Sequence, residues 1–472
     1  MKRVRRISLA VLIVVGAAFL VIGSDRAADA PPGFVVEYWE KWSGAEAEQM
    51  QLIVDDFNRT VGREKKIFVR FMSMTDVDQK TLVAIAAGVP PDVAGMWDQQ
   101  VSQFAALDAV QPLDELAAEH GITAETYLPV FWNGCHYHGR LYGLVSTAGT
   151  VALIYNKQVF HEAEKQLRAA GLDPNRAPAT LDELDRYAAA MDEVNAQGQV
   201  DRAGYLPLQS WYVPLISYWF GGDIFDPVSD RFTLDSPQTI RAYQWIQSYS
   251  RRLGRRGIMD FQNSLGSFDS PQNPLLVGKL AMQQQGAWMA NYIEHLRPPM
   301  SEVLVPKDQE YTLARRTDNY AWAVAPFPSA VPGLADVSYC SFDVLMIPKG
   351  ARHPRQAFDF IAYVNRQDVA EKLETLHSKN CQLRHVSEEF LAHHPNPYIA
   401  IYQKLAASPN AHGIPPVPIW PEVEKELNDT AQAVAFEGAD PATALAAAQQ
   451  RVQARYDRFH RMEERRRQLG IN

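Results

Sequence analysis

The strongest constraint on the fold is a regular alternation of strand-like and helix-like segments early in the chain. Residues 34–39, 67–72 and 92–97 have the composition of strands. The two stretches between them, 45–60 and 77–87, carry apolar residues at helical spacing. Strand, helix, strand, helix, strand predicts a parallel sheet with right-handed crossovers, and therefore an α/β fold.

Open parallel sheets bind ligands beyond the carboxyl ends of their strands. This rule selects Trp42 and Ser43 after the first strand, and Trp97, Asp98 and Gln99 at the end of the third. A core position for Trp42 and a solvated loop for Asp98 and Gln99 are the alternatives, because tryptophan is usually largely buried and acidic residues are usually exposed.

The stretch 141–157 has the pattern of a passage between two lobes. An apolar run at 141–144 and a second at 151–155 enclose the small and polar residues 146–150. This pattern predicts two short strands with a joint between them that absorbs changes in backbone angles, as a hinge requires. Two strands of one ordinary sheet joined by a loop are the alternative.

Length, charge and the N-terminus narrow the class of protein. A chain of 472 residues exceeds the size of one hydrophobic core, so at least two domains are expected. A net charge of -9 and the lack of a basic stripe argue against nucleic-acid binding. Residues 1–30 combine a basic start, an apolar run at 7–22 and small residues at 28–30, which predicts an export signal or, since Pro31 follows, a retained anchor.

The three cysteines, Cys135, Cys340 and Cys381, are too few for a disulfide scaffold, and we expect them to be buried thiols. Bridges between Cys340 and Cys381, or between Cys135 and Cys340, remain open. Motifs of nucleophilic hydrolases, zinc proteases and P-loops do not occur, and His136 and His138 lack a second pair at metal-binding spacing. No metal or cofactor is predicted.

Aromatic side chains are concentrated between residues 209 and 226 around the pair Gly221-Gly222. Ring faces cover the C–H surface of a sugar, and glycine allows close approach of the backbone, so this segment is a candidate carbohydrate site. A buried helix is the alternative interpretation. The rings belong to Trp211, Tyr212, Tyr218, Trp219, Phe220 and Phe225.

Several further segments occur in an order that resembles the extracellular solute-binding proteins of family 1, the carbohydrate receptors of ABC importers. They are W-x-x-W at 39–42, TLVAIAAGVPPDV at 81–93, LYGLV at 141–145, VALIYNK at 151–157, PATLDEL at 178–184, WFGGDIFD at 219–226, LAMQQQGAWM at 280–289 and VLMIPKGARHPRQAFDFIAYV at 344–364. The resemblance covers nearly all of the chain after the signal segment.

The resemblance implies a type II periplasmic-binding-protein fold, with two α/β lobes, parallel-rich sheets and a hinge of three crossings. It places residues 33–146 and 286–338 in the first lobe, and residues 151–285 and 342–472 in the second. It further implies a monomeric, non-enzymatic, extracytoplasmic receptor that closes around an oligosaccharide and delivers it to the transmembrane subunits of an ABC permease. A receptor for a sensor or chemotaxis system is an alternative, and so is a secreted glycan hydrolase that pairs Asp98 with Asp223 or Asp226.

The predicted ligand-binding residues combine stacking rings with hydrogen-bonding groups. Near the third crossing, Tyr339 to Phe342 replace the glycines usual in the family, which leaves the ligand geometry there open. The complete predicted set is Trp42, Ser43, Asp98, Gln99, Tyr155, Trp211, Trp219, Gly222, Asp223, Trp288, Phe342 and Trp420.

Overall fold

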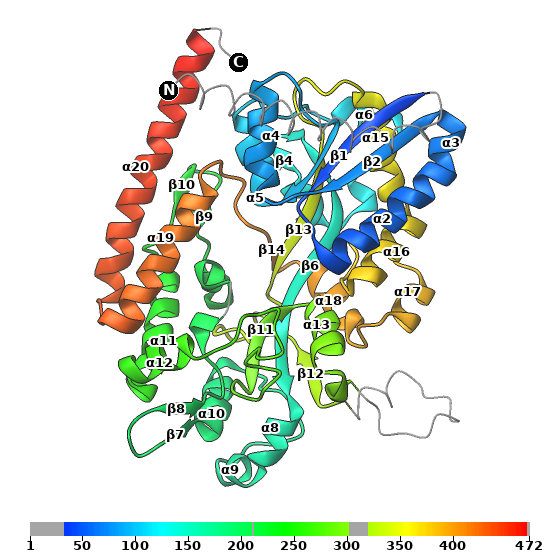
Figure 1. Ribbon diagram of the computed structural model, residues 1–472. Coiled ribbons are helices and arrows are strands. Elements are labelled where there is room, and N and C mark those ends of the chain that lie inside the picture. The colour runs from blue at the N-terminus through cyan, green and yellow to red at the C-terminus, as the bar shows by residue number, and fades with distance from the viewer. Residues whose placement is uncertain (1–32, 210–211, 302–319, 470–472) are drawn as a thin grey trace, which may run out of the picture.

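The computed structural model describes residues 33–209, 212–301 and 320–469. A mixed eight-stranded sheet runs through the molecule in the order β11-β6-β13-β3-β1-β2, with β12 also paired to β6 and β14 to β13 (Figure 1). Its strands are β1 (Phe34–Glu40), β2 (Ile67–Ser73), β3 (Val93–Trp97), β6 (Gly143–Asn156), β11 (Met282–Gly286), β12 (Trp322–Ala325), β13 (Ser338–Met346) and β14 (Ala411–His412).

The alternation at the start of the chain forms the parallel part of this sheet, as predicted. β1 pairs in parallel with both β2 and β3. The connecting helices are α2 (Gly44–Arg59) and α4 (Val77–Ala86), and α2 buries one apolar face that includes Met50, Val54 and Phe57. β3 then pairs antiparallel with β13, so the complete sheet is mixed.

The stretch 141–157 forms a passage, but it is one continuous strand rather than two strands with a joint. β6 has 14 residues, all buried, and β13 runs antiparallel beside it from Thr150 to Gly143. The register shifts between Asp343 and Val344, opposite Ser146, so the expected joint is a β-bulge. Buried backbone groups require hydrogen-bond partners, and the ladder with β13 supplies them where a loop would not.

The pairing of the later strands bears on the lobe boundaries, which remain a prediction. β11 and β12 both pair with the second half of β6. The end of β13 pairs with β3, and α15 (Pro354–Val364) packs on β1 and α2. The pairing partner of a strand depends on contacts that are distant in sequence, and strand patterns alone do not encode them.

Helices cover both halves of the sheet, and the last helix lies along the outer edge of the molecule (Figure 1). In the first lobe they are α2, α3 (Val61–Lys65), α4, α5 (Gln99–Ala106), α6 (Asp114–Glu119), α7 (Pro129–Gly134), α15 and α16 (Gln367–His377). In the second they are α8 (Lys157–Glu162), α9 (Glu164–Ala169), α10 (Leu181–Met191), α11 (Pro237–Leu253), α12 (Arg255–Asn263) and α13 (Met289–Leu296). The C-terminal region adds α17 (Glu388–His393), α18 (Ile399–Ala406), α19 (Trp420–Gln432) and α20 (Pro441–Gln468).

Short elements complete the fold. They are the hairpins β4 (His136–Tyr137) with β5 (Arg140–Leu141), β7 (Glu193–Val194) with β8 (Val200–Arg202) and β9 (Phe225–Asp226) with β10 (Arg231–Phe232), the 3-10 helices η2 (Ala124–Thr126), η3 (Pro207–Gln209), η4 (Val213–Phe220) and η5 (Pro298–Met300), and the π-helix η6 (Ala433–Glu437).

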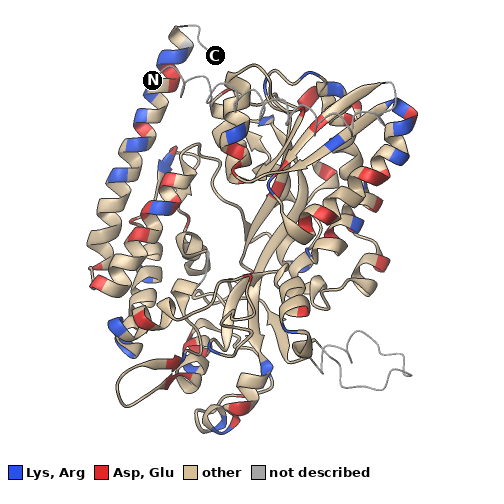
Figure 2. Cartoon of the chain, viewed as in Figure 1, with Lys and Arg blue, Asp and Glu red and all other residues tan. Residues whose placement is uncertain are grey.

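Charged residues are spread over the outer helices, α20 included, whereas the central strands carry few (Figure 2).

The cysteines are buried thiols. Cys135, Cys340 and Cys381 are free, so neither of the two bridges left open by the sequence forms. Burial raises the pKa of the Cys340 thiol to about 12, which keeps it a neutral, apolar group. The predicted signal segment at 1–30 lies outside the described residues. Within the part of the chain that the structure describes, every helix is too short or too polar to cross a bilayer.

Candidate functional site

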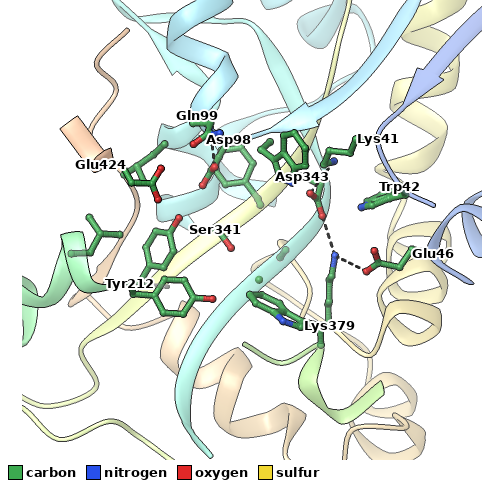
Figure 3. A pocket seen from close by; sticks show the side chains of 18 of the residues that line it. Lys41, Trp42, Glu46, Asp98, Gln99, Tyr212, Ser341, Asp343, Lys379 and Glu424 are labelled. Carbon is green, nitrogen blue, oxygen red and sulfur yellow. Dashed lines mark hydrogen bonds and ion pairs between the residues drawn. The ribbon is translucent and has the colours of Figure 1, made fainter. Parts of the chain in front are cut away.

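A cavity of about 540 Å³ lies between the two lobes, next to the crossing strands (Figure 3). The carboxyl ends of β1 and β3 form one side, β6 and β13 form its floor, and the segments around η4, α13 and α19 form the other side. Its lining residues are Lys41, Trp42, Ser43, Glu46, Trp97, Asp98, Gln99, Ala148, Gly149, Tyr212, Pro214, Leu215, Phe268, Trp288, Tyr292, Tyr339, Ser341, Phe342, Asp343, Lys379, Ile414, Trp420 and Glu424.

The structure brings seven of the predicted ligand-binding residues together in this cavity. β1 and β3 are neighbours in the sheet, so the residues that follow them meet at one edge. Trp211 lies outside the described residues. The seven lining residues are Trp42, Ser43, Asp98, Gln99, Trp288, Phe342 and Trp420.

Trp219 and Tyr155 lie away from the cavity. Trp219 is fully buried in η4, and its Nε1 donates a hydrogen bond to the Val337 carbonyl at 3.1 Å. Tyr155 is buried in the second half of β6 and packs against Phe160. Both rings are core residues of the second lobe, because η4, which carries Trp219, and β6, which carries Tyr155, bury the side chains of all their residues.

Gly222 and Asp223 also lie away from the cavity. Gly221 has a φ of 71° and ends η4 in the left-handed conformation that glycine tolerates. A Cβ on Gly222 would lie 2.5 Å from Cβ of Gln238, so this glycine permits packing against α11. Asp223 is exposed. The glycine pair therefore has a structural role at the end of η4, and the carboxylate pair considered for a hydrolase does not meet in the cavity.

One end of the cavity holds an ion cluster that sequence patterns did not indicate. Asp343 Oδ1 lies 2.9 Å from Lys41 Nζ, and its Oδ2 lies 3.0 Å from Lys379 Nζ. Thr147 donates a further hydrogen bond to Oδ2 at 2.5 Å, and Glu46 lies 3.6 Å from Lys379. Burial raises the pKa of Asp343, but the two lysines outweigh it and hold that pKa well below its usual range. The only signal in the sequence was a carboxylate within an otherwise apolar strand.

The ion cluster supports two indole rings. Lys41 Nζ lies 4.7 Å from the ring centroid of Trp42 and 5.3 Å from that of Trp97. Trp42 is 5% exposed and packs edge-on against His377, whereas Trp97 is 45% exposed. Cation–π contacts hold the rings at the cavity wall. Trp97 is therefore readily accessible to a ligand, whereas little of Trp42 is.

The opposite end of the cavity is acidic (Figure 3). Asp98 caps α5, and its Oδ1 accepts a hydrogen bond from the Gln99 backbone N–H at 2.8 Å. Burial raises the pKa of Asp98 to about 7, and Asp343 and Glu424 add to the rise by repulsion. Burial also raises the pKa of Glu424, which projects from α19. This end of the cavity can accept hydrogen bonds from a ligand.

The indole of Trp288 packs on two glycines, and this contact can be tested by mutation. A Cβ on Gly149 would lie 2.7 Å from Cζ3 of the indole, and one on Gly286 would lie 2.2 Å from it. Gly149→Ala is therefore expected to displace the ring and weaken ligand binding about tenfold, measured by calorimetry. Gly413→Ala is the control, since its Cβ would meet nothing closer than 3.8 Å. Equal affinities of the two variants would contradict this seating of the indole.

The chain has a sequence relative among known sugar-binding proteins. The chain is 22% identical over 248 residues to the maltotriose-binding protein of Pyrococcus abyssi (strain GE5 / Orsay), a match that covers 52% of this chain and 49% of that protein. The chain thus spans about half the length of this relative.

Solved structures share the fold over more of the chain. CpMnBP1 with mannobiose bound has a TM-score of 0.71 at 23% identity, covering 88% of this chain and 98% of that one. The sugar-binding protein MalE from the phytopathogen Xanthomonas citri has a TM-score of 0.70 at 20% identity, covering 92% and 98%. The predicted type II periplasmic-binding-protein fold is confirmed. The family model for bacterial extracellular solute-binding proteins matches residues 41–371, well over half of the sequence, and the chain belongs to that family.

Proposed function

We propose that this protein is the extracytoplasmic binding component of an ABC importer and that its ligand is an oligosaccharide. The observation that carries the proposal is the cavity between the lobes, which aromatic side chains line together with a few convergent polar groups. Its volume of about 540 Å³ lies in the range of small-molecule sites. The names of the relatives, which include receptors for maltotriose and mannobiose, support this ligand class.

The lining residues suit a sugar on chemical grounds. Trp97 and Trp288 would cover C–H faces of the sugar rings, whereas Trp42 and Trp420, 5% and 2% exposed, would add little contact surface. Hydroxyl groups of the sugar would form hydrogen bonds with the polar side chains that line the cavity, namely those of Asp98, Gln99, Ser43 and Glu46. We propose this set in place of the predicted one, without Trp219, Tyr155, Gly222 and Asp223.

Ligand binding would be coupled to closure of the lobes. The cavity takes Trp97 and Asp98 from the first lobe and Trp288 from the second, so only a closed form contacts both sides of a ligand. A ligand shifts such an equilibrium by its difference in affinity for the two forms. The bulge at Ser146 in β6, opposite Asp343 and Val344 of β13, would be the place where the crossing strands bend. The closed form would then dock on the permease as a monomer.

Transport and sensing would use the same cavity, since one fold serves both. We favour transport because the family comprises binding proteins of importers. A hydrolase is not favoured, because Asp223 and Asp226 do not line the cavity that holds Asp98.

A thermal-shift screen tests the proposal. Maltotriose, mannobiose, mannotriose and other saccharides, with amino acids and peptides as controls, are added to the purified protein. A ligand at a hundredfold excess over its Kd stabilises the folded state by about 2.7 kcal/mol, which raises Tm measurably. We expect at least one saccharide to do so. A shift caused by amino acids or peptides alone would contradict the proposal.

A further inference from the structure

We infer that the acidic end of the cavity, formed by Asp98 and Glu424, is a subsite for a sugar ring that carries a protonated amine. The inference rests on the function proposed above, since it names the class of saccharide that the same cavity selects. It follows from three observations: an unpartnered buried oxygen, a second unpaired carboxylate and the distribution of charge along the cavity.

The first observation concerns Asp98. The residue is 9% exposed and lines the cavity, and its Oδ1 is held by the Gln99 N–H at 2.8 Å. Its Oδ2 has no hydrogen-bond partner among the described residues. A buried carboxylate oxygen without a donor costs free energy, and a ligand that supplies a donor recovers that cost. The carboxylate of Asp98 is thus held in position by one oxygen, while the other oxygen can accept a hydrogen bond from a ligand.

The second observation concerns Glu424. It lies on α19, which places it across from the end of β3, and its side chain is drawn close to Asp98 and Gln99 in the same end of the cavity (Figure 3). In the parts of the chain that the structure describes, no hydrogen bond or ion pair involves its carboxylate. Glu424 is near enough to Asp98 to help raise the pKa of that carboxyl by repulsion, after the larger effect of burial.

The third observation is that the cations of the cavity are already paired. Of the six charged side chains that line it, four are acidic and two, Lys41 and Lys379, are basic. Both lysines bind Asp343, at 2.9 and 3.0 Å, in the ion cluster at the other end. The Asp98–Glu424 end therefore holds two acidic groups that pair with no cation among the described residues.

An ammonium group matches this environment better than a hydroxyl. It carries a positive charge and three donors, so one group can serve both carboxylates through charge-assisted bonds, which are about twice as strong as neutral ones. Tyr212 and Tyr339 also line the cavity near Asp98, and ring faces attract cations. A hydroxyl donates one bond and leaves the charge uncompensated.

The subsite should also couple binding to protonation. Asp98 faces Asp343 and Tyr339 on β13, Glu424 on α19, Tyr212 before η4 and, farther off, Cys135 after α7. Burial, together with repulsion from Asp343 and Glu424, raises its pKa to about 7, whereas a bound ammonium would lower it. Near pH 7, binding of an amino sugar should therefore release a proton, which calorimetry in buffers of different ionisation enthalpy detects.

The experiment compares matched sugars by calorimetry at pH 7 on the full chain. Glucosamine, mannosamine and di-glucosamine are titrated against glucose, mannose and cellobiose, with the N-acetylated forms as uncharged analogues. We expect at least one amine to bind tenfold or more tighter than its neutral counterpart. The double variant Asp98→Asn with Glu424→Gln should abolish that preference, whereas Glu422→Gln, an exposed residue on the same helix, should keep it.

The outcomes separate this inference from the proposed function. Neutral sugars that bind as tightly as the amines, or amines that fail to bind while maltotriose or mannotriose binds, would overturn the inference and leave the proposed function standing. An amine preference that persists in the double variant would place the cationic subsite elsewhere and overturn the assignment. Failure of every saccharide would instead remove the proposed function.

Discussion

Trp288→Ala is expected to weaken saccharide binding at least tenfold while the protein remains folded. The half-buried indole stands at the start of α13 and packs on the backbone of Gly149 and Gly286, so its outer face is turned toward the cavity. Alanine removes that face. Tenfold corresponds to about 1.4 kcal/mol, within reach of one aromatic contact and the area it covers.

Calorimetry with the saccharide that gives the largest thermal shift measures this effect. Trp132→Ala is the matched control, because Trp132 is also half-buried but packs against Tyr127, at a centroid distance of 5.3 Å, outside the cavity. The control should lose stability and keep its Kd. Equal affinity of the Trp288 variant and the unmodified protein would remove this ring from the site.

Asp343→Asn is expected to destabilise the fold by roughly 3–5 kcal/mol, the usual cost of leaving buried charges without their partner. The carboxylate stands between Lys41 and Lys379, and the exposed fraction of the three side chains does not exceed 12%. The midpoint of urea denaturation reports the change. Asp108→Asn breaks an exposed pair with Lys349, at 3.0 Å, and should cost at most about 1 kcal/mol.

The pH dependence of this effect has a definite sign. The pKa of Asp343 is lower in the folded protein than in the unfolded chain, so its stabilising contribution is complete above the unfolded value of about 4. That contribution disappears as the pH falls through the folded pKa. The difference between the variant and the unmodified protein should therefore be constant from about pH 5 to 8 and shrink in stronger acid. A difference that is unchanged in strong acid would contradict the ion cluster.

Local patterns were a good guide where one segment determines its own structure. The spacing of apolar residues predicted β1, α2, β2, α4 and β3, because each period of two or 3.6 residues buries one face. The rule for strand ends then selected Trp42, Asp98 and Gln99, and the parallel pairing of β1 with β3 brings them together.

The same patterns failed where the outcome depends on a distant neighbour. Trp219 and Trp288 both stand next to glycines in aromatic segments of the sequence. In the structure, Trp219 is buried in the core, where it donates a hydrogen bond to Val337, whereas Trp288 packs on two glycines at the cavity. The pairing of β12 with β6 and of β13 with β3 could not be predicted, because each of these strands could pair with several partners. Lys41, Lys379 and Glu424 were missed because a single charged residue carries no periodicity.

The amino-acid sequence by itself determined the class of fold, the order of its strands and helices, and one edge of the cavity, since these depend on regularities within short segments. Only the tertiary structure decided which strand crosses the lobes unbroken, which rings reach the cavity and which charges meet there. Those features arise when residues hundreds of positions apart, such as Lys41 and Asp343, come within hydrogen-bond distance. The interaction energy of such an ion pair depends on burial and geometry, and no local stretch of the chain encodes either of them.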